Sequence, residues 1–314
     1  MTFDPSLYGD PLTLIARLGR INERADRAAA LEQWGLQPQE SDAGSSFAQD
    51  NSGFLPELGD HVVESSALWP LMSATDNLAT AADQFHGVIK ATQAGSRRAL
   101  HAPSTLNLCR AALEASARAI WILSPTDRDV RRKRAFGANL VEMKANWKYT
   151  SNQVGYLRSG KVRAPADEVK EYLEGHKALL KLHGELEVRT DEYETPPGYM
   201  STVEKAAEWI EQNLPAHDTG ELRENGLVIG SGNVYQLTSA IIHGYQWAND
   251  FFRNGNLFAV LADSFGAAVN MTECGIALFE THAQDPAGTE RTRYYPSRLE
   301  PTIQKWFSRD SDSD

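Results

Sequence analysis

Residues 104–123 read STLNLCRAALEASARAIWIL, and this stretch decides the fold class. Leu106, Cys109, Leu113 and Ile120 follow one another at intervals of three, four and seven residues, which places them on one face of an α-helix. Polar and small side chains lie between them, and the stretch shows no alternation with a period of two. It therefore predicts an amphipathic helix with one buried face.

The same periodicity runs through most of the chain and predicts an all-α, multi-helix bundle. The expected helices span residues 11–34, 62–93 with a break near Pro70, 104–123, 126–153, 165–186, 201–214, 232–250 and 257–282. Residues 227–229 are the only candidate for a short strand.

Capping signals support several of these boundaries. Asp10 precedes Pro11, and Ser124–Asp127 combines a cap, a proline and an early acid, a pattern typical of helix starts. Ser201 and Glu204 match a capping box, in which each side chain satisfies a backbone N–H of the other residue. The sequence thus predicts helix starts at these three places.

Less periodic segments suggest a division of the chain into three parts. Residues 36–60 are rich in Ser, Gly, Asp, Gln and Pro, and residues 187–200 are acidic with a Pro-Pro-Gly end, so both are predicted to be surface loops. We expect residues 1–60 to form an N-terminal helix and linker, 61–286 a helical core domain, and 287–314 a frayed acidic tail.

Composition narrows the class of protein. The 314 residues are 41% hydrophobic and 23% charged, a globular balance, and no apolar run approaches the roughly 18 residues of a membrane-spanning helix. The N-terminus lacks the basic and apolar regions of a secretory signal, and neither of the two cysteines lies in a CxxC pair. These features predict a soluble, cytoplasmic protein without disulfides and without a membrane partner.

Charge is unevenly distributed along this acidic chain, whose net charge is −11. Residues 97–181 contain 17 Lys or Arg and 8 Asp or Glu, and the basic side chains are densest at Arg131, Arg132, Lys133 and Arg134. These four residues are candidates for binding phosphate or RNA backbone. The alternative is an ordinary solvated helix face paired with nearby carboxylates.

Two further groups of side chains could carry chemistry. Arg110 and Glu114 lie one turn apart at the edge of the buried face of their helix, where they could form a structural ion pair or orient a catalytic group. Tyr235, Ser239 and His243 share one face of the later helix, and His243 could transfer protons near neutral pH or be a structural histidine. Gly244, beside His243, would allow another backbone to approach closely.

Motifs for other chemistries are missing or incomplete. Asp83 and His86 have a ligand-like spacing, but no further ligand motif completes a metal site, and Gly230–Gly232 lacks the pattern of a dinucleotide loop. The chain contains no P-loop and no GxSxG. No metal and no cofactor is predicted.

A resemblance to a known group rests on these same pieces. The run Leu108–Glu114, the run Ala119–Leu123, the arginine-rich segment Arg128–Arg134 and the pattern Tyr235-xxx-Ser239-xxx-His243-Gly244 resemble uncharacterised helical bacterial and phage proteins related to HEPN and abortive-infection domains. The similarity covers about residues 73–282. HEPN ribonucleases carry an Arg four to six residues from a His on one helix. Here Arg97 and Arg98 precede His101 by three and two residues, and no arginine precedes His243 at that distance.

Three functions follow as hypotheses. The resemblance implies a HEPN-like protein that binds RNA or a nucleotide in phage defence or a toxin system. If it cleaves RNA without a metal, His243 would transfer the proton and Arg110 would stabilise phosphate charge. The alternatives are a noncatalytic helical interaction protein, with a protein partner or a second copy, and a small-molecule sensor.

Overall fold

The computed structural model describes residues 11–96, 98–248, 250, 256–285, 288 and 291–311. Asp10, Arg97 and the last three residues of the expected tail lie outside these ranges. Within the described ranges the protein is helical and contains no β-strand, which confirms the all-α prediction. The α-helices are α1 (Pro11–Ala30), α2 (Glu32–Leu36), α3 (Ser46–Asn51), α4 (Val62–Gln93), α5 (Ala102–Leu123), α6 (Arg128–Arg158), α7 (Ala166–Glu187), α8 (Tyr199–Gln212), α9 (Glu221–Asn225), α10 (Val228–Ile242), α12 (Leu257–Ala283) and α13 (Glu300–Ser311).

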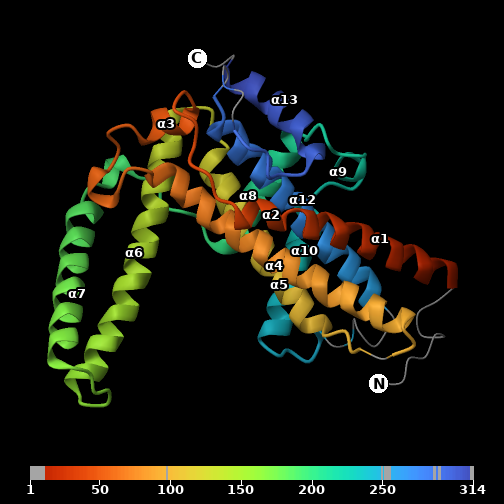
Figure 1. Cartoon of the computed structure of the whole chain (residues 1–314), viewed down its shortest axis with the longest axis horizontal. Helices are drawn as coiled ribbons and strands as arrows, with labels where there is room; N and C mark the ends of the chain where they lie inside the picture. Colours follow the sequence, from red (N-terminus) through yellow and green to blue (C-terminus); the bar gives the residue numbers. More distant parts are fainter. Residues whose placement is uncertain are drawn as a thin grey trace.

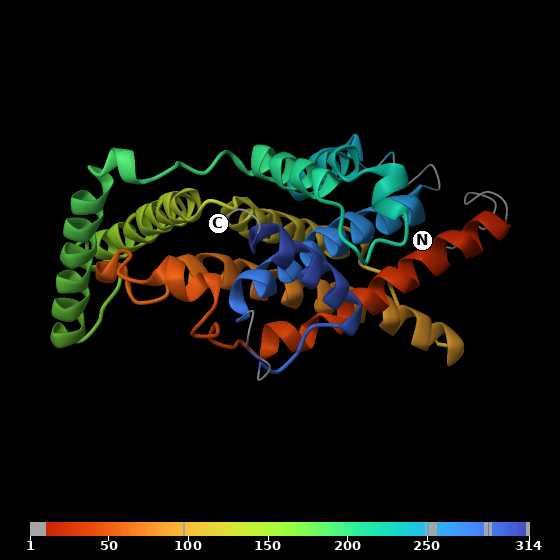
Figure 2. The ribbon, with the colours of Figure 1, turned by 90° about the horizontal axis from the view of Figure 1, so that it is seen from above.

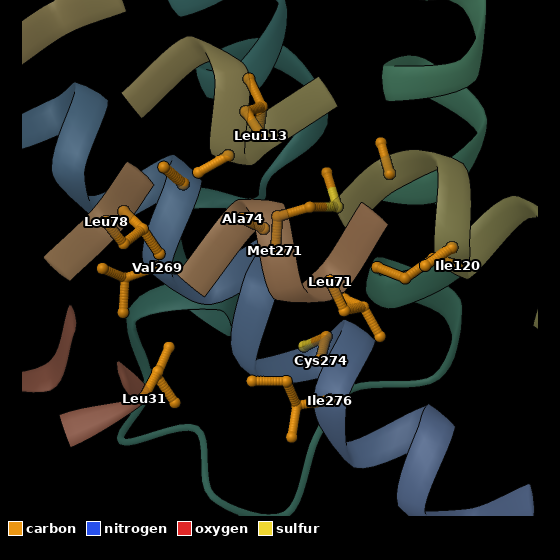
Figure 3. Packing of buried hydrophobic residues seen from close by; sticks show 14 of the residues in the cluster. Leu31, Leu71, Ala74, Leu78, Leu113, Ile120, Val269, Met271, Cys274 and Ile276 are labelled. Carbon is orange, nitrogen blue, oxygen red and sulfur yellow. The ribbon is translucent and has the colours of Figure 1, made fainter. Parts of the chain in front are cut away.

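Helices α4, α5 and α12 form the centre of the bundle (Figure 1). Helix α12 is buried on all sides over most of its length, as expected for a helix with little polar surface. Figure 3 shows Leu71 of α4, Ile120 of α5 and Cys274 of α12 packed together, each fully buried. Gly275 permits this close packing, because a Cβ there would lie 2.6 Å from the side chain of Leu71.

Helices α6 and α7 extend together from the bundle as a two-helix arm (Figures 1 and 2). A small cluster at its root contains Phe136, Leu140 and Leu186, with Leu55 and Val62 packed against them. Beyond this root most arm side chains are exposed, and only His183 and Leu186 of α7 are buried. The arm therefore depends on few contacts with the rest of the protein.

The three parts expected from the sequence share one core. Ile21, Phe47, Ile303 and Trp306 belong to the same buried cluster as the central helices. Residues 36–60 are not a plain linker, because they contain α3, whose Phe47 is fully buried. The described part of the C-terminal segment is likewise not frayed, since α13 buries Ile303 and Trp306. Composition suggested loops, but a few apolar side chains in each segment are enough to bind it to the core.

Several local predictions need correction. Helix α4 continues through Pro70, because buried Ala67, Leu71 and Ala74 hold both sides of it against the bundle. Helix α8 begins at Tyr199 after Gly198, so the expected capping box lies inside the helix.

The start of α6 also differs: Asp127 provides its cap, accepting from the backbone N–H of Asp129 at 2.7 Å, while Ser124 ends α5. Residues 228 and 229 begin α10 rather than a strand, and α10 ends at Ile242 rather than near residue 250. At the other end of the chain, Leu12 and Ile15 are exposed, so the expected apolar face of α1 is buried only from its second half.

Candidate functional site

A groove of about 520 Å³ opens between α4, α5, α6 and the start of α8. Trp69 and Pro70 of α4 line one side, and the segment Pro196–Tyr199 lines another. Ala111 and Ala115 of α5 also line it, and their small side chains leave its space free. Gly137 of α6 lets the segment before Pro196 pass close to that helix: a Cβ on Gly137 would lie 1.9 Å from the carbonyl oxygen of Glu194.

Three aromatic side chains line the groove. Trp69 is 66% exposed and Tyr199 is 73% exposed, although both rings are largely apolar. Trp121 also lines the groove but is 2% exposed, and its Nε1 finds no acceptor among the described residues. A buried N–H without an acceptor is costly, and the burial of this indole keeps its Nε1 out of reach of a molecule in the groove.

Charged side chains in the groove already have partners. Arg118 pairs with Glu142 of α6, with Nη2 and Oε1 2.5 Å apart. Glu114 pairs with Arg110, whose Nε lies 2.5 Å from its Oε1. The groove is therefore close to electrically neutral.

The predicted pair Arg110 and Glu114 links α5 to α10. The guanidinium of Arg110 lies 4.4 Å from the ring centroid of Tyr235, so the arginine is held between a carboxylate and an aromatic face. Both charged side chains are largely buried. This geometry matches the structural ion pair of the sequence hypotheses, and it brings three of the five predicted catalytic residues together beside the groove.

The remaining two predicted residues lie elsewhere along α10. Ser239 is half-buried one turn after Tyr235, and its carbonyl accepts from the backbone N–H of His243 at 3.1 Å. His243 follows the last residue of α10 and is exposed; its position eight residues after Tyr235 corresponds to about 12 Å along the axis. Its ring centroid lies 5.8 Å from that of Tyr245, and the described contacts include none with Arg110 or Glu114.

Gly244 has a different role from the one expected. A Cβ there would meet nothing within 4 Å, so no other backbone approaches it closely. Its φ of +67° instead ends α10 in the left-handed conformation that glycine adopts readily.

The arginines of the predicted phosphate-binding tetrad bond to other parts of the protein. Arg131 is 5% exposed and makes two bonds to the carboxylate of Asp50, at 2.7 and 2.9 Å. Arg132 donates to the carbonyls of Gln49, Asp50 and Ser52, and Arg134 bonds to Glu194 and to the carbonyl of Trp121. Burial raises the pKa of Asp50, and the arginines beside it oppose this. Only Lys133 is exposed.

A buried polar cluster was missed by the sequence interpretation. Glu273 of α12 bonds to Arg27 of α1 at 2.7 Å and to Arg298, and His217 lies 3.7 Å away. Thr302 Oγ1 accepts the backbone N–H of His217 and lies 2.7 Å from its Nδ1, while Nε2 faces Glu273. Burial, with Arg298 and Arg27, lowers the pKa of His217 to about 3.

This cluster combines a hydroxyl, an imidazole and a carboxylate, but Thr302 is fully buried and no substrate can reach its oxygen. Its members come from α1, α12, the loop before α9 and the C-terminal segment, and nothing in the sequence pattern brings them together. The cluster therefore fastens the C-terminal segment to the bundle.

The groove residues also escaped the sequence interpretation, although two signals were present. Trp69 precedes Pro70, and Tyr199 follows the Pro-Pro-Gly of residues 196–198, so each side of the groove carries an aromatic residue near proline. Proline removes a backbone donor and stiffens the chain, which suits a rigid apolar wall.

Comparisons with protein-family models, with curated proteins and with solved structures gave no match. The HEPN-like relationship stays a prediction from the sequence. The described residues contain no group of three or more His, Cys, Asp or Glu side chains that could hold a metal. No described helix is long and apolar enough to cross a membrane.

Proposed function

We propose that this is a noncatalytic binding protein whose groove takes a small, flat, largely apolar molecule. The observation that carries the proposal is the groove itself. Its volume of about 520 Å³ lies within the range of small-molecule sites, roughly 300–1,000 Å³, and its lining is mainly aromatic and apolar.

The charges favour a neutral ligand. Glu114 pairs with Arg110 and Glu142 pairs with Arg118, so neither a cation nor an anion would find a free counter-charge on these side chains.

The test uses Nile red, a neutral flat dye with a carbonyl, whose emission shifts to the blue in apolar surroundings. We expect saturable binding by the full chain, and about tenfold weaker binding in Trp69→Ala and in Tyr199→Ala, since each removes one aromatic wall.

Tyr149→Ala is the matched control, because Tyr149 is 63% exposed on α6 and does not line the groove. The proposal fails if the wild-type chain does not bind the dye saturably, or if Tyr149→Ala weakens binding as much as the groove variants do.

A further inference from the structure

One face of the arm is basic. Residues 143–163 contain five Lys or Arg and no Asp or Glu. At about 100° per residue, Lys144, Lys148 and Arg158 point roughly 120–160° away from Asn146 on α6. Asn146 lines a hollow between the two helices of the arm, so the three basic residues lie on the opposite side of α6.

Helix α7 carries both signs of charge. Glu168, Glu171 and Tyr172 line the hollow that Asn146 also lines. Lys170 and Lys177 are about 140–160° from Tyr172 around the helix, so they too point away from the hollow, and Asp167 and Glu174 lie at the same angles. We call Lys144, Lys148, Arg158, Lys170 and Lys177 the basic face of the arm. Lys161 and Arg163 extend it around the tip.

The side chains of this face have few partners within the protein. All five are exposed, and Lys144, Lys148, Arg158 and Lys177 make no ion pair with any described residue. Lys170 reaches Glu174 of its own helix at 4.0 Å. Five positive charges, partly offset on α7 by Asp167 and Glu174, thus stand on a projecting element of a chain whose net charge is −11.

We propose that the basic face binds the phosphate backbone of a nucleic acid. The α6 charges from Lys144 to Arg158 extend over about 21 Å of helix axis, a length that can follow several successive phosphates. Ser151 and Gly155 lie between them, so the row offers no apolar centre of the kind that protein interfaces need. The chemistry favours a regular polyanion over a folded protein.

The experiment measures binding of a labelled mixed-sequence RNA duplex and the matching DNA duplex to the full chain by fluorescence anisotropy, over a range of salt concentrations. We expect binding that weakens steeply with salt, because phosphate contacts release counterions. Lys144→Gln combined with Lys148→Gln should weaken binding at low salt about tenfold or more. It should also reduce the slope of log affinity against log salt by about 2, since each lost phosphate contact removes about 0.9.

The control combines Lys90→Gln with Lys205→Gln, which changes net charge equally at exposed lysines on α4 and α8. It should keep the wild-type affinity and slope, and both variants should keep the wild-type melting temperature. Absence of binding at low salt, or an equal loss in the control, overturns the proposal. Displacement of the RNA by polyglutamate at equal charge concentration also overturns it, because the face would then recognise acidic polypeptide.

Discussion

The two ends of α6 use their basic residues in opposite ways. At the root, Arg131, Arg132 and Arg134 donate to the carboxylate or carbonyl oxygens of residues far away in the chain. In the arm, Lys144 and Lys148 are exposed and make no ion pair with any described residue. The residues at both ends contribute equally to the charge of the sequence, yet only the second group can meet a partner.

Side-chain chemistry accounts for this difference. The planar guanidinium of Arg131 matches the two oxygens of Asp50, and Arg132 and Arg134 each reach more than one acceptor at once. A lysine ammonium is strongly hydrated and is rarely buried, so it stays on the surface when no carboxylate lies nearby. The acceptors near each side chain decide its place, since Arg158 of the arm is also an arginine and is exposed.

The largest expected effect on stability comes from a substitution at the root of the arm. Arg131→Met leaves Asp50 buried without its two hydrogen bonds, and we expect the free energy of unfolding to fall by about 3–5 kcal/mol in a urea titration. Neutral replacement of all four residues Arg131–Arg134 should destabilise the fold further. Lys144→Ala, on the arm, should change stability by less than about 0.5 kcal/mol.

Similar effects of Arg131→Met and Lys144→Ala on the free energy of unfolding would show that the two ends of α6 do not differ in this way. The effect of Arg131→Met should also depend on pH. Because burial raises the pKa of Asp50, the penalty of Arg131→Met should shrink in mild acid, where Asp50 becomes neutral.

The fold was predictable where periodicity and packing agree. The helices at 104–123 and 257–282 were placed within two residues of α5 and α12, because their apolar side chains recur at helical spacing and face the core. The packing of α3 and of the C-terminal segment on the core could not be predicted. Single residues such as Phe47 and Trp306 hold these segments to the bundle, and single residues leave no periodic pattern in the sequence.

The site was predictable only in part, for a similar reason. Arg110 and Glu114 are one turn apart on one helix, so their pairing follows from spacing alone, whereas the contact of Arg110 with Tyr235 depends on how α10 lies against α5. The groove and the cluster at Glu273 each join four separate parts of the chain. Sequence patterns within one helix carry no information about contacts between distant parts of the chain.

A second, smaller effect is the pH dependence of stability that a buried histidine causes. The pKa of His217 is lowered from 6.5 to about 3, so the unfolded chain binds a proton in this range that the folded chain does not. Stability is therefore full above about pH 6.5 and is lost as the pH falls towards 3. Between about pH 7 and pH 5 we expect His217 to account for a loss of about 2 kcal/mol.

Urea titrations of the wild type and His217→Gln at both pH values measure this contribution as a difference. Burial also lowers the pKa of His282, which adds to the loss in both proteins and cancels in the comparison. A wild-type protein that loses no more stability than His217→Gln would show that His217 is not held neutral by the fold.

The smallest expected effect on stability is at His243, which resembles the arm lysines in being exposed. Because its side chain lies beyond the end of α10, His243→Ala should change the melting temperature little, corresponding to less than about 0.5 kcal/mol.

The same variant tests the resemblance to HEPN ribonucleases, which assigns proton transfer to this residue. With Arg110 held by Glu114 and Tyr235 and His243 about 12 Å further along α10, we expect no metal-independent RNA cleavage that depends on His243. Cleavage by the wild type in the presence of a chelator, lost in a fully stable His243→Ala, would contradict the noncatalytic proposal and restore the ribonuclease hypothesis.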